Sequence, residues 1–134
     1  IKQYEEMVFY RSRDTSVDQT AQSLTKLYRL PNVSVRLISS IEDIKKEIAA
    51  GRLIIVPAAG QMLSNPHFIP PGPFYHMLVV RGFDDKNNTF ITNDPGTRYG
   101  NSYAYNQQKL FAAIHDWNNG DVLHGEKKVI VVGR

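Results

Sequence analysis

Two neighbouring runs near the middle of the chain carry its clearest structural pattern: YHMLVVRGFDD at residues 75–85 and FITNDPG at residues 90–96. Their β-branched and aromatic side chains predict strands at residues 75–83 and 89–93. The polar residues 84–88 between these strands favour a turn. The sequence therefore predicts a β-hairpin, and the remaining elements are placed around it.

The hairpin also predicts that an imidazole and a carboxylate meet at its open end. If the turn occupies residues 84–87 and Phe83 faces Asn88, then His76 and Asp94 fall nearly opposite each other. Facing side chains in an antiparallel pair have Cβ atoms roughly 4.5–5.5 Å apart, which allows a hydrogen bond between these two residues. His76 and Asp94 are therefore the candidate catalytic residues.

Two interpretations of this pair remain open from the residue types alone. A carboxylate bonded to an imidazole fixes the tautomer of the ring and stabilises its protonated form, as the orienting member of a catalytic triad does. Alternatively, Asp94 opens the Asp-Pro-Gly turn at residues 94–96 by accepting backbone N–H groups. In that case His76 is an ordinary residue at the start of a strand.

Before the hairpin, apolar residues at helical spacing predict a helix from Ser16 to about Leu30. Either Thr15 or Ser16 caps its start, and Pro31 is expected to stop it. The other elements expected before the hairpin are a short helix or packed segment at 1–14, a strand at 33–37, a helix at 41–50, a buried central strand at 52–58 and a long loop at 59–75.

After the hairpin, a helix is expected to start at Asn106 and to present Leu110, Phe111, Ile114 and Trp117 to the core. Strands at 102–105 and 127–132 complete the predicted elements. This order favours an α+β fold with helices packed on a mainly antiparallel sheet. A length of 134 residues fits one domain spanning residues 1–134.

Composition narrows the range of functions. The 16 Lys and Arg residues are scattered among 13 Asp and Glu residues, so nucleic acid is not an expected partner. The apolar runs at 53–56 and 129–132 are far shorter than the roughly 20 residues of a membrane-spanning helix. The chain contains no Cys, which excludes a disulfide, a zinc-thiolate site and a thiol nucleophile within these residues.

The proline-rich loop at residues 65–74 ends directly before the hairpin and supports two interpretations. Its prolines and aromatic residues suit the wall or lid of a cleft that holds an extended peptide, with Arg98 and Tyr99 at the border. Equally, Phe68 and Phe74 could anchor the loop to the core. His67 could join His76 and Asp94 at a metal, but a histidine on a polar loop is more often solvated, so no metal or other cofactor is expected.

The hairpin resembles a known family of peptidases. Residues 75–85 and 90–96 are similar to the histidine strand and the Asn-Asp-Pro-Gly segment of peptidase family thirty-nine-like domains. These domains are papain-like cysteine peptidases, related to the enzymes that remove double-glycine leaders from bacteriocin precursors. The helix at 41–50 with Gly51 and the strand after it, and residues 102–105 before the last helix, also resemble family elements, so the resemblance covers roughly residues 35–118.

This resemblance implies that His76 is the general base and that Asp94 orients it. Family members carry the nucleophilic Cys on an N-terminal helix, after a Gln that helps to form the oxyanion hole. Here neither is recognisable: Gln3, Gln19 and Gln22 do not precede a Cys, and the oxyanion role is assigned to none of them. No Gly-x-Ser-x-Gly elbow presents a serine in its place.

Two functional classes therefore remain. The first is a bacterial hydrolase of the thiol protease type, which cleaves a peptide or protein substrate with a Cys located upstream of residue 1. Because the chain starts at Ile1 rather than Met, we expect an upstream segment of the same precursor as a partner, and a secreted or cell-envelope location is favoured. The second is a catalytically inactive, peptide-binding or structural module. Another transferase or amidase of papain-like shape is a further possibility, because a fold does not fix a function.

Overall fold

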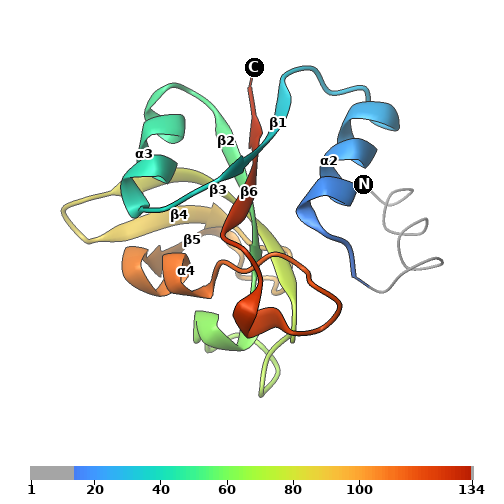
Figure 1. Ribbon diagram of the computed structural model, residues 1–134. Coiled ribbons are helices and arrows are strands. Elements are labelled where there is room, and N and C mark those ends of the chain that lie inside the picture. The colour runs from blue at the N-terminus through green and yellow to red at the C-terminus, as the bar shows by residue number, and fades with distance from the viewer. Residues whose placement is uncertain (1–13, 134) are drawn as a thin grey trace.

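A computed structural model describes residues 14–133 and shows a six-stranded sheet with helices on both faces (Figure 1). The strand order is β1-β6-β2-β3-β4-β5, and every neighbouring pair is antiparallel. The predicted α+β class is confirmed, whereas the segment expected at 1–14 lies outside the described residues apart from Asp14. The elements are α2 (Val17–Lys26), β1 (Val33–Leu37), α3 (Ile41–Ala49), β2 (Leu53–Ala58), β3 (His76–Asp84), β4 (Thr89–Asn93), β5 (Asn101–Asn106), α4 (Gln107–Ala113) and β6 (Lys128–Val132).

The two faces of the sheet carry different helices. Along β6, Val129 and Val131 face the core under α3 and α4, whereas Ile130 faces α2. Figure 1 shows α2 on the opposite side of the sheet from α3 and α4. The larger core also contains Leu78 and Phe90 from the hairpin, both almost fully buried. Burial of each such side chain stabilises the fold by about 1.5–3 kcal/mol, so this core holds the hairpin in place.

Helix α2 starts as predicted and ends earlier. Ser16 caps it: the Ser16 hydroxyl accepts the N–H of Gln19 at 3.2 Å, and the Gln19 side chain accepts the N–H of Ser16 at 2.9 Å. The prediction that the helix continues to Leu30 is wrong, because it ends at Lys26 and Arg29 adopts a positive φ of 51°. Leu27 is 52% exposed, so a longer helix would have little more to bury, and packing rather than Pro31 determines the end.

Helix α4 starts at its predicted cap and also ends early. The Asn106 side chain accepts the N–H of Lys109, and Leu110 and Ile114 are fully buried as expected. After Ala113 the chain leaves the helix to pair with the end of β2, since the Ala113 carbonyl accepts the N–H of Ala59 at 2.8 Å.

Trp117 therefore lies beyond α4, and the prediction that it packs this helix onto the sheet is wrong. Its ring instead contacts Tyr75, with a centroid distance of 5.2 Å. The last turn of α4 is held by Lys127, whose ammonium donates to the carbonyls of Phe111 at 2.7 Å and Ile114 at 3.1 Å. Burial lowers the pKa of the Lys127 ammonium.

The hairpin forms between β3 and β4 with a register different from the predicted one. Phe83 faces Phe90 rather than Asn88, and Asp84 faces Thr89. The Asp84 carboxylate accepts the N–H of Lys86 at 3.0 Å, which places the turn at residues 85–88 instead of 84–87. A register shift between Val80 and Gly82 then moves the pairing one residue back toward the predicted register at the open end.

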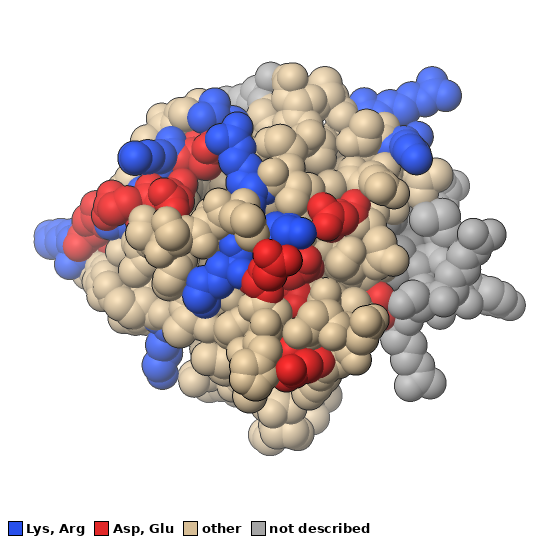
Figure 2. Space-filling view, in the orientation of Figure 1, with Lys and Arg blue, Asp and Glu red and all other residues tan. Residues whose placement is uncertain are grey.

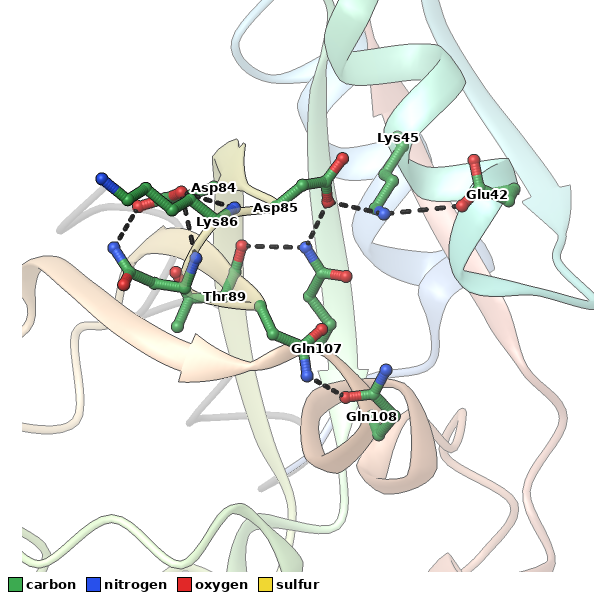
Figure 3. Close-up of polar contacts among 10 residues, drawn as sticks. Glu42, Lys45, Asp84, Asp85, Lys86, Thr89, Gln107 and Gln108 are labelled. Atoms are coloured by element: carbon green, nitrogen blue, oxygen red, sulfur yellow. Dashed lines mark hydrogen bonds and ion pairs between the residues drawn. The ribbon is translucent and has the colours of Figure 1, made fainter.

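Polar contacts tie the tip of this hairpin to both helices of the larger core (Figure 3). The Asp85 carboxylate binds the ammonium of Lys45 from α3 at 2.7 Å and the amide of Gln107 from α4 at 3.0 Å. Gln107 also donates to the carbonyl of Thr89 at 3.2 Å. These contacts fix the turn against the helices, so the hairpin is clamped at its tip and packed along its length.

Charges of both signs lie close together on the face shown in Figure 2. Such pairs are bonded at several places on the molecule: Glu47 forms ion pairs with Arg36 at 3.2 Å and with Arg52 at 2.5 Å. Within residues 14–133, no helix is both long and apolar enough to cross a membrane.

Candidate active site

The structure brings His76 and Asp94 together at the open end of the hairpin. His76 is the first residue of β3, and Asp94 directly follows β4. The His76 Nε2 atom lies 2.5 Å from Asp94 Oδ1, so the predicted hydrogen bond is present. The last β3–β4 pair is Val79 with Asn93, and the same register sets Asp94 opposite Leu78. His76 is two residues further along the same face, which makes the contact diagonal rather than directly opposite.

Asp94 is a buried residue whose carboxylate accepts hydrogen bonds on both of its oxygens. Its side chain has no exposed surface. Oδ1 accepts from His76 and from the N–H of Gly96 at 2.8 Å, and Oδ2 accepts from the Tyr105 hydroxyl at 2.5 Å. Burial by itself raises the pKa of a carboxyl, but the bonds from His76, Tyr105 and Gly96 outweigh it and lower the pKa of Asp94. Asp94 is therefore ionised at neutral pH and can only accept hydrogen bonds.

The ring of His76 is held in one orientation. Because ionised Asp94 cannot donate, the hydrogen of their bond is on Nε2, and Nδ1 is the nitrogen left for another group. The Phe68 ring packs edge-on against the imidazole with centroids 5.5 Å apart. Gly96 lies where these two rings meet, since a Cβ atom there would lie 2.9 Å from both His76 Cε1 and Phe68 Cε1. Only glycine leaves room for the ring at this position.

Two further buried residues extend the site, and the sequence alone did not identify them. Tyr105 of β5 is 4% exposed and Asn65 of the proline-rich loop is 7% exposed. Asn65 Nδ2 donates to the Tyr105 hydroxyl at 2.8 Å, and Asn65 Oδ1 accepts the N–H of His67 at 2.8 Å. The alternation of β5 was the available signal, since Tyr103 and Tyr105 share the face that packs on Phe90.

The proline-rich loop combines anchored and exposed side chains. Phe68 is 8% exposed and belongs to the larger core, so it anchors the loop as one of the two interpretations expected. Ile69 is 90% exposed and Phe74 is 53% exposed. Tyr99 stacks on His67 with centroids 4.4 Å apart, which connects the turn after Asp94 to this loop. The loop therefore adjoins the His76 site through its buried residues and presents apolar side chains to solvent.

The remaining histidines make local contacts. His115 Nδ1 lies 2.8 Å from the Gly125 carbonyl, and the exposed His124 pairs with Asp121 at 2.8 Å. Across residues 14–133, no three His, Asp or Glu side chains are grouped to hold a metal ion, so His67 does not form a metal cluster with His76 and Asp94.

The fold and this histidine–aspartate pair define a peptidase-like domain of the papain-like class. A family model described as Peptidase_C39 like family matches residues 4–120, and the chain belongs to this family.

A solved structure has the same fold: a candidate C39-like peptidase from Bacillus anthracis superposes with a TM-score of 0.60 at 15% sequence identity. The match covers 90% of this chain and 60% of that one, so the chain spans about 60% of the length of this relative. No significant match was found among curated proteins.

Proposed function

We propose that His76 and Asp94 are the proton-transfer pair of a thiol peptidase whose Cys is supplied from outside these 134 residues. The observation that carries this proposal is the pair itself. Asp94 is buried, ionised and bonded to His76 Nε2, so that Nδ1 is the ring nitrogen left to exchange a proton. A structural Asp-Pro-Gly turn needs the backbone bond to Gly96 but does not need an imidazole on the same oxygen.

In the proposed reaction, His76 Nδ1 takes the proton of the Cys thiol, and the thiolate attacks the carbonyl carbon of the scissile peptide. The imidazolium then gives that proton to the leaving amine as the C–N bond breaks, which leaves a thioester. In the second half, His76 takes a proton from water, and the hydroxide attacks the thioester carbonyl and displaces the thiolate to give the carboxylic acid product. The imidazolium returns its proton to the thiolate, which restores the Cys thiol and the neutral imidazole. Asp94 stays ionised throughout and stabilises the imidazolium that forms in each half.

The absence of Cys favours a second candidate, a peptidase-like module that binds peptides or has a structural role without catalysis. This module would keep the fold and the His76–Asp94 pair but lack a nucleophile. The two candidates agree that these 134 residues alone do not hydrolyse peptides, because an imidazole and a carboxylate cannot form the covalent intermediate.

The experiment that separates the candidates uses the natural protein with any residues that precede Ile1. The peptidase proposal expects a Cys there that a thiol reagent labels, and peptide cleavage that is lost in His76→Ala. His124→Ala is the matched control, because His124 is exposed and distant in sequence from the pair. Cleavage that survives His76→Ala would contradict the mechanism. A natural protein that binds peptides, without labelling or cleavage, would favour the non-catalytic module.

A further inference from the structure

A third side chain, Tyr105, donates a hydrogen bond to the carboxylate of the His76–Asp94 pair. We propose that Tyr105 is a positioning residue, which fixes the orientation of the Asp94 carboxylate and so the ring of His76. This inference rests on the proposed function for its catalytic meaning, although its structural content can be measured separately.

The division of hydrogen bonds at Asp94 supports this role. Oδ1 accepts both from His76 and from the N–H of Gly96, whereas Oδ2 accepts from the Tyr105 hydroxyl. Donors on both oxygens stop the carboxylate from rotating about its Cβ–Cγ bond. Without the Tyr105 hydroxyl, Oδ2 would carry negative charge with no hydrogen-bond donor in a buried site, and nothing on that oxygen would oppose rotation of the carboxylate.

The chemistry of the groups determines which one donates in each hydrogen bond between Asp94, Tyr105 and Asn65. Ionised Asp94 only accepts, so the Tyr105 hydroxyl must donate to it and can accept from Asn65 Nδ2. The amide orientation of Asn65 is set at its other end, because Asn65 Oδ1 accepts the N–H of His67. Burial and the bond to Asp94 raise the pKa of the Tyr105 hydroxyl, which therefore keeps its proton at any pH at which the protein functions.

Asn65 connects this series of hydrogen bonds to the proline-rich loop. The same loop places Phe68 against the imidazole, so His76 is held both by its bond to Asp94 and by packing against the loop. Asn65 is expected to act through Tyr105, with a smaller effect than Tyr105 itself, because its loss removes a bond to the hydroxyl and leaves the bond to Asp94 in place.

The chain offers a matched control for the Tyr105 hydroxyl. Tyr103 lies on the same strand and its ring contacts that of Tyr105 with centroids 4.7 Å apart, yet the hydrogen bond to Asp94 comes from Tyr105. Tyr105→Phe and Tyr103→Phe each remove one oxygen from the same cluster. Only the first is expected to change the Asp94–His76 pair.

The first measurement is NMR on the 134-residue chain. In Tyr105→Phe, the Asp94 side-chain carbon should titrate at a higher pH than in the unmodified chain, and the Nε2 proton signal of His76 should weaken through faster exchange with water. Asn65→Ala should move both signals in the same direction by less, and it serves if Tyr105→Phe fails to fold. Unchanged signals in Tyr105→Phe, or an equal change in Tyr103→Phe, would overturn the proposal.

The second measurement applies to the natural protein with its Cys. Tyr105→Phe should lower kcat about tenfold or more with little change in KM, while Tyr103→Phe leaves both near the unmodified values, because a misoriented base affects the chemical step. A loss confined to KM would overturn the positioning role. If the NMR signals shift but no form of the protein cleaves peptides, the proposed function fails while the positioning of His76 by Tyr105 stands.

Discussion

The two ends of the β3–β4 hairpin each hold an aspartate, and the two aspartates differ in their burial and in the chemistry of their partners. Asp85 at the tip has a side chain that is 60% exposed, and it binds Gln107 and the fixed cation Lys45. Asp94 at the open end has no exposed side-chain surface, and its partner is an imidazole. Hydrogen bonds lower the pKa of both carboxyls, first from Gln107 for Asp85, and from His76 against the effect of burial for Asp94.

This difference distinguishes a structural contact from a candidate catalytic one. At the tip, Asp85 joins two helices to a turn through partners that do not change charge near neutral pH, which suits a clamp. At the open end, His76 uses Nε2 for its bond to Asp94, which leaves Nδ1 of the ring for another group. A lowered carboxyl pKa occurs at both ends, so it does not by itself identify the functional site.

The largest expected effect on stability separates the two aspartates directly. Asp94→Ala should lower the free energy of unfolding by about 3–5 kcal/mol, because it removes one member of a buried pair and leaves His76 and Tyr105 without their acceptor. Asp85→Ala should have a much smaller effect, since exposed ion pairs contribute little. Urea unfolding of both variants tests this. Equal losses would remove the distinction between the two ends.

A smaller effect is expected from the glycines near the two ends. Gly96→Ala should destabilise the protein by about 1–3 kcal/mol, because the new Cβ would lie 2.9 Å from His76 and Phe68 atoms in a packed site. Gly82→Ala is the matched control, since its Cβ would meet Ile91 at an ordinary 3.5 Å. Denaturant midpoints of the two variants provide the comparison. A loss as large for Gly82→Ala would show that the open end is not packed more tightly than the strand near the tip.

The smallest expected effect is a difference in acid sensitivity. A carboxyl with a lowered folded pKa contributes stability above its ordinary value of 3.8 and loses it as the pH falls through the folded pKa. Stability should therefore fall below pH 3.8 less steeply in Asp94→Asn than in the unmodified chain, by at most about 1.4 kcal/mol per pH unit.

Two further carboxylates sharpen this measurement. The contribution of Asp85 to the acid-dependent loss of stability should decrease when salt is added, because that residue is exposed. The contribution of Asp94 should not decrease, because that residue is buried. Asp116 has the opposite sign: burial raises the pKa of its carboxyl, so its contribution is lost as the pH rises through that value. Urea unfolding across the acid range, at low and high salt, tests all three. An Asp94→Asn variant with the unmodified acid profile would contradict the lowered pKa.

Much of the fold could be predicted because it depends on local patterns. Alternation and polar turns predicted the strands, Gly51 marked the end of the helix at 41–50, and the hairpin brought His76 to Asp94. The contact tolerated the wrong register because a diagonal neighbour on the same face is still within reach.

The parts that failed depend on contacts between distant residues. α4 ends where the Ala113 carbonyl accepts the N–H of Ala59. α2 ends before Leu27, an apolar residue that is not buried. The alternation of β5 places Tyr105 on the core face, but Asn65 and Tyr105 are 40 residues apart and meet only in the folded chain, so the sequence does not show that they bond to each other. Catalytic roles for His76 and Asp94 remain predictions that the kinetic experiments address.

The strand order has a consequence for the way the chain acquires its structure during synthesis. Of the six strands in residues 14–133, β6 is made last, yet it lies between β1 and β2, which do not pair with each other. The ribosome therefore releases β1 and α2 long before the partner that joins them to the sheet exists. The hairpin and its neighbours β2 and β5 form a contiguous set that can pair earlier. β1 therefore cannot join the sheet until residues 128–132 have left the ribosome, and a nascent chain stalled before residue 128 would hold the His76–Asp94 hairpin while β1 remains unpaired.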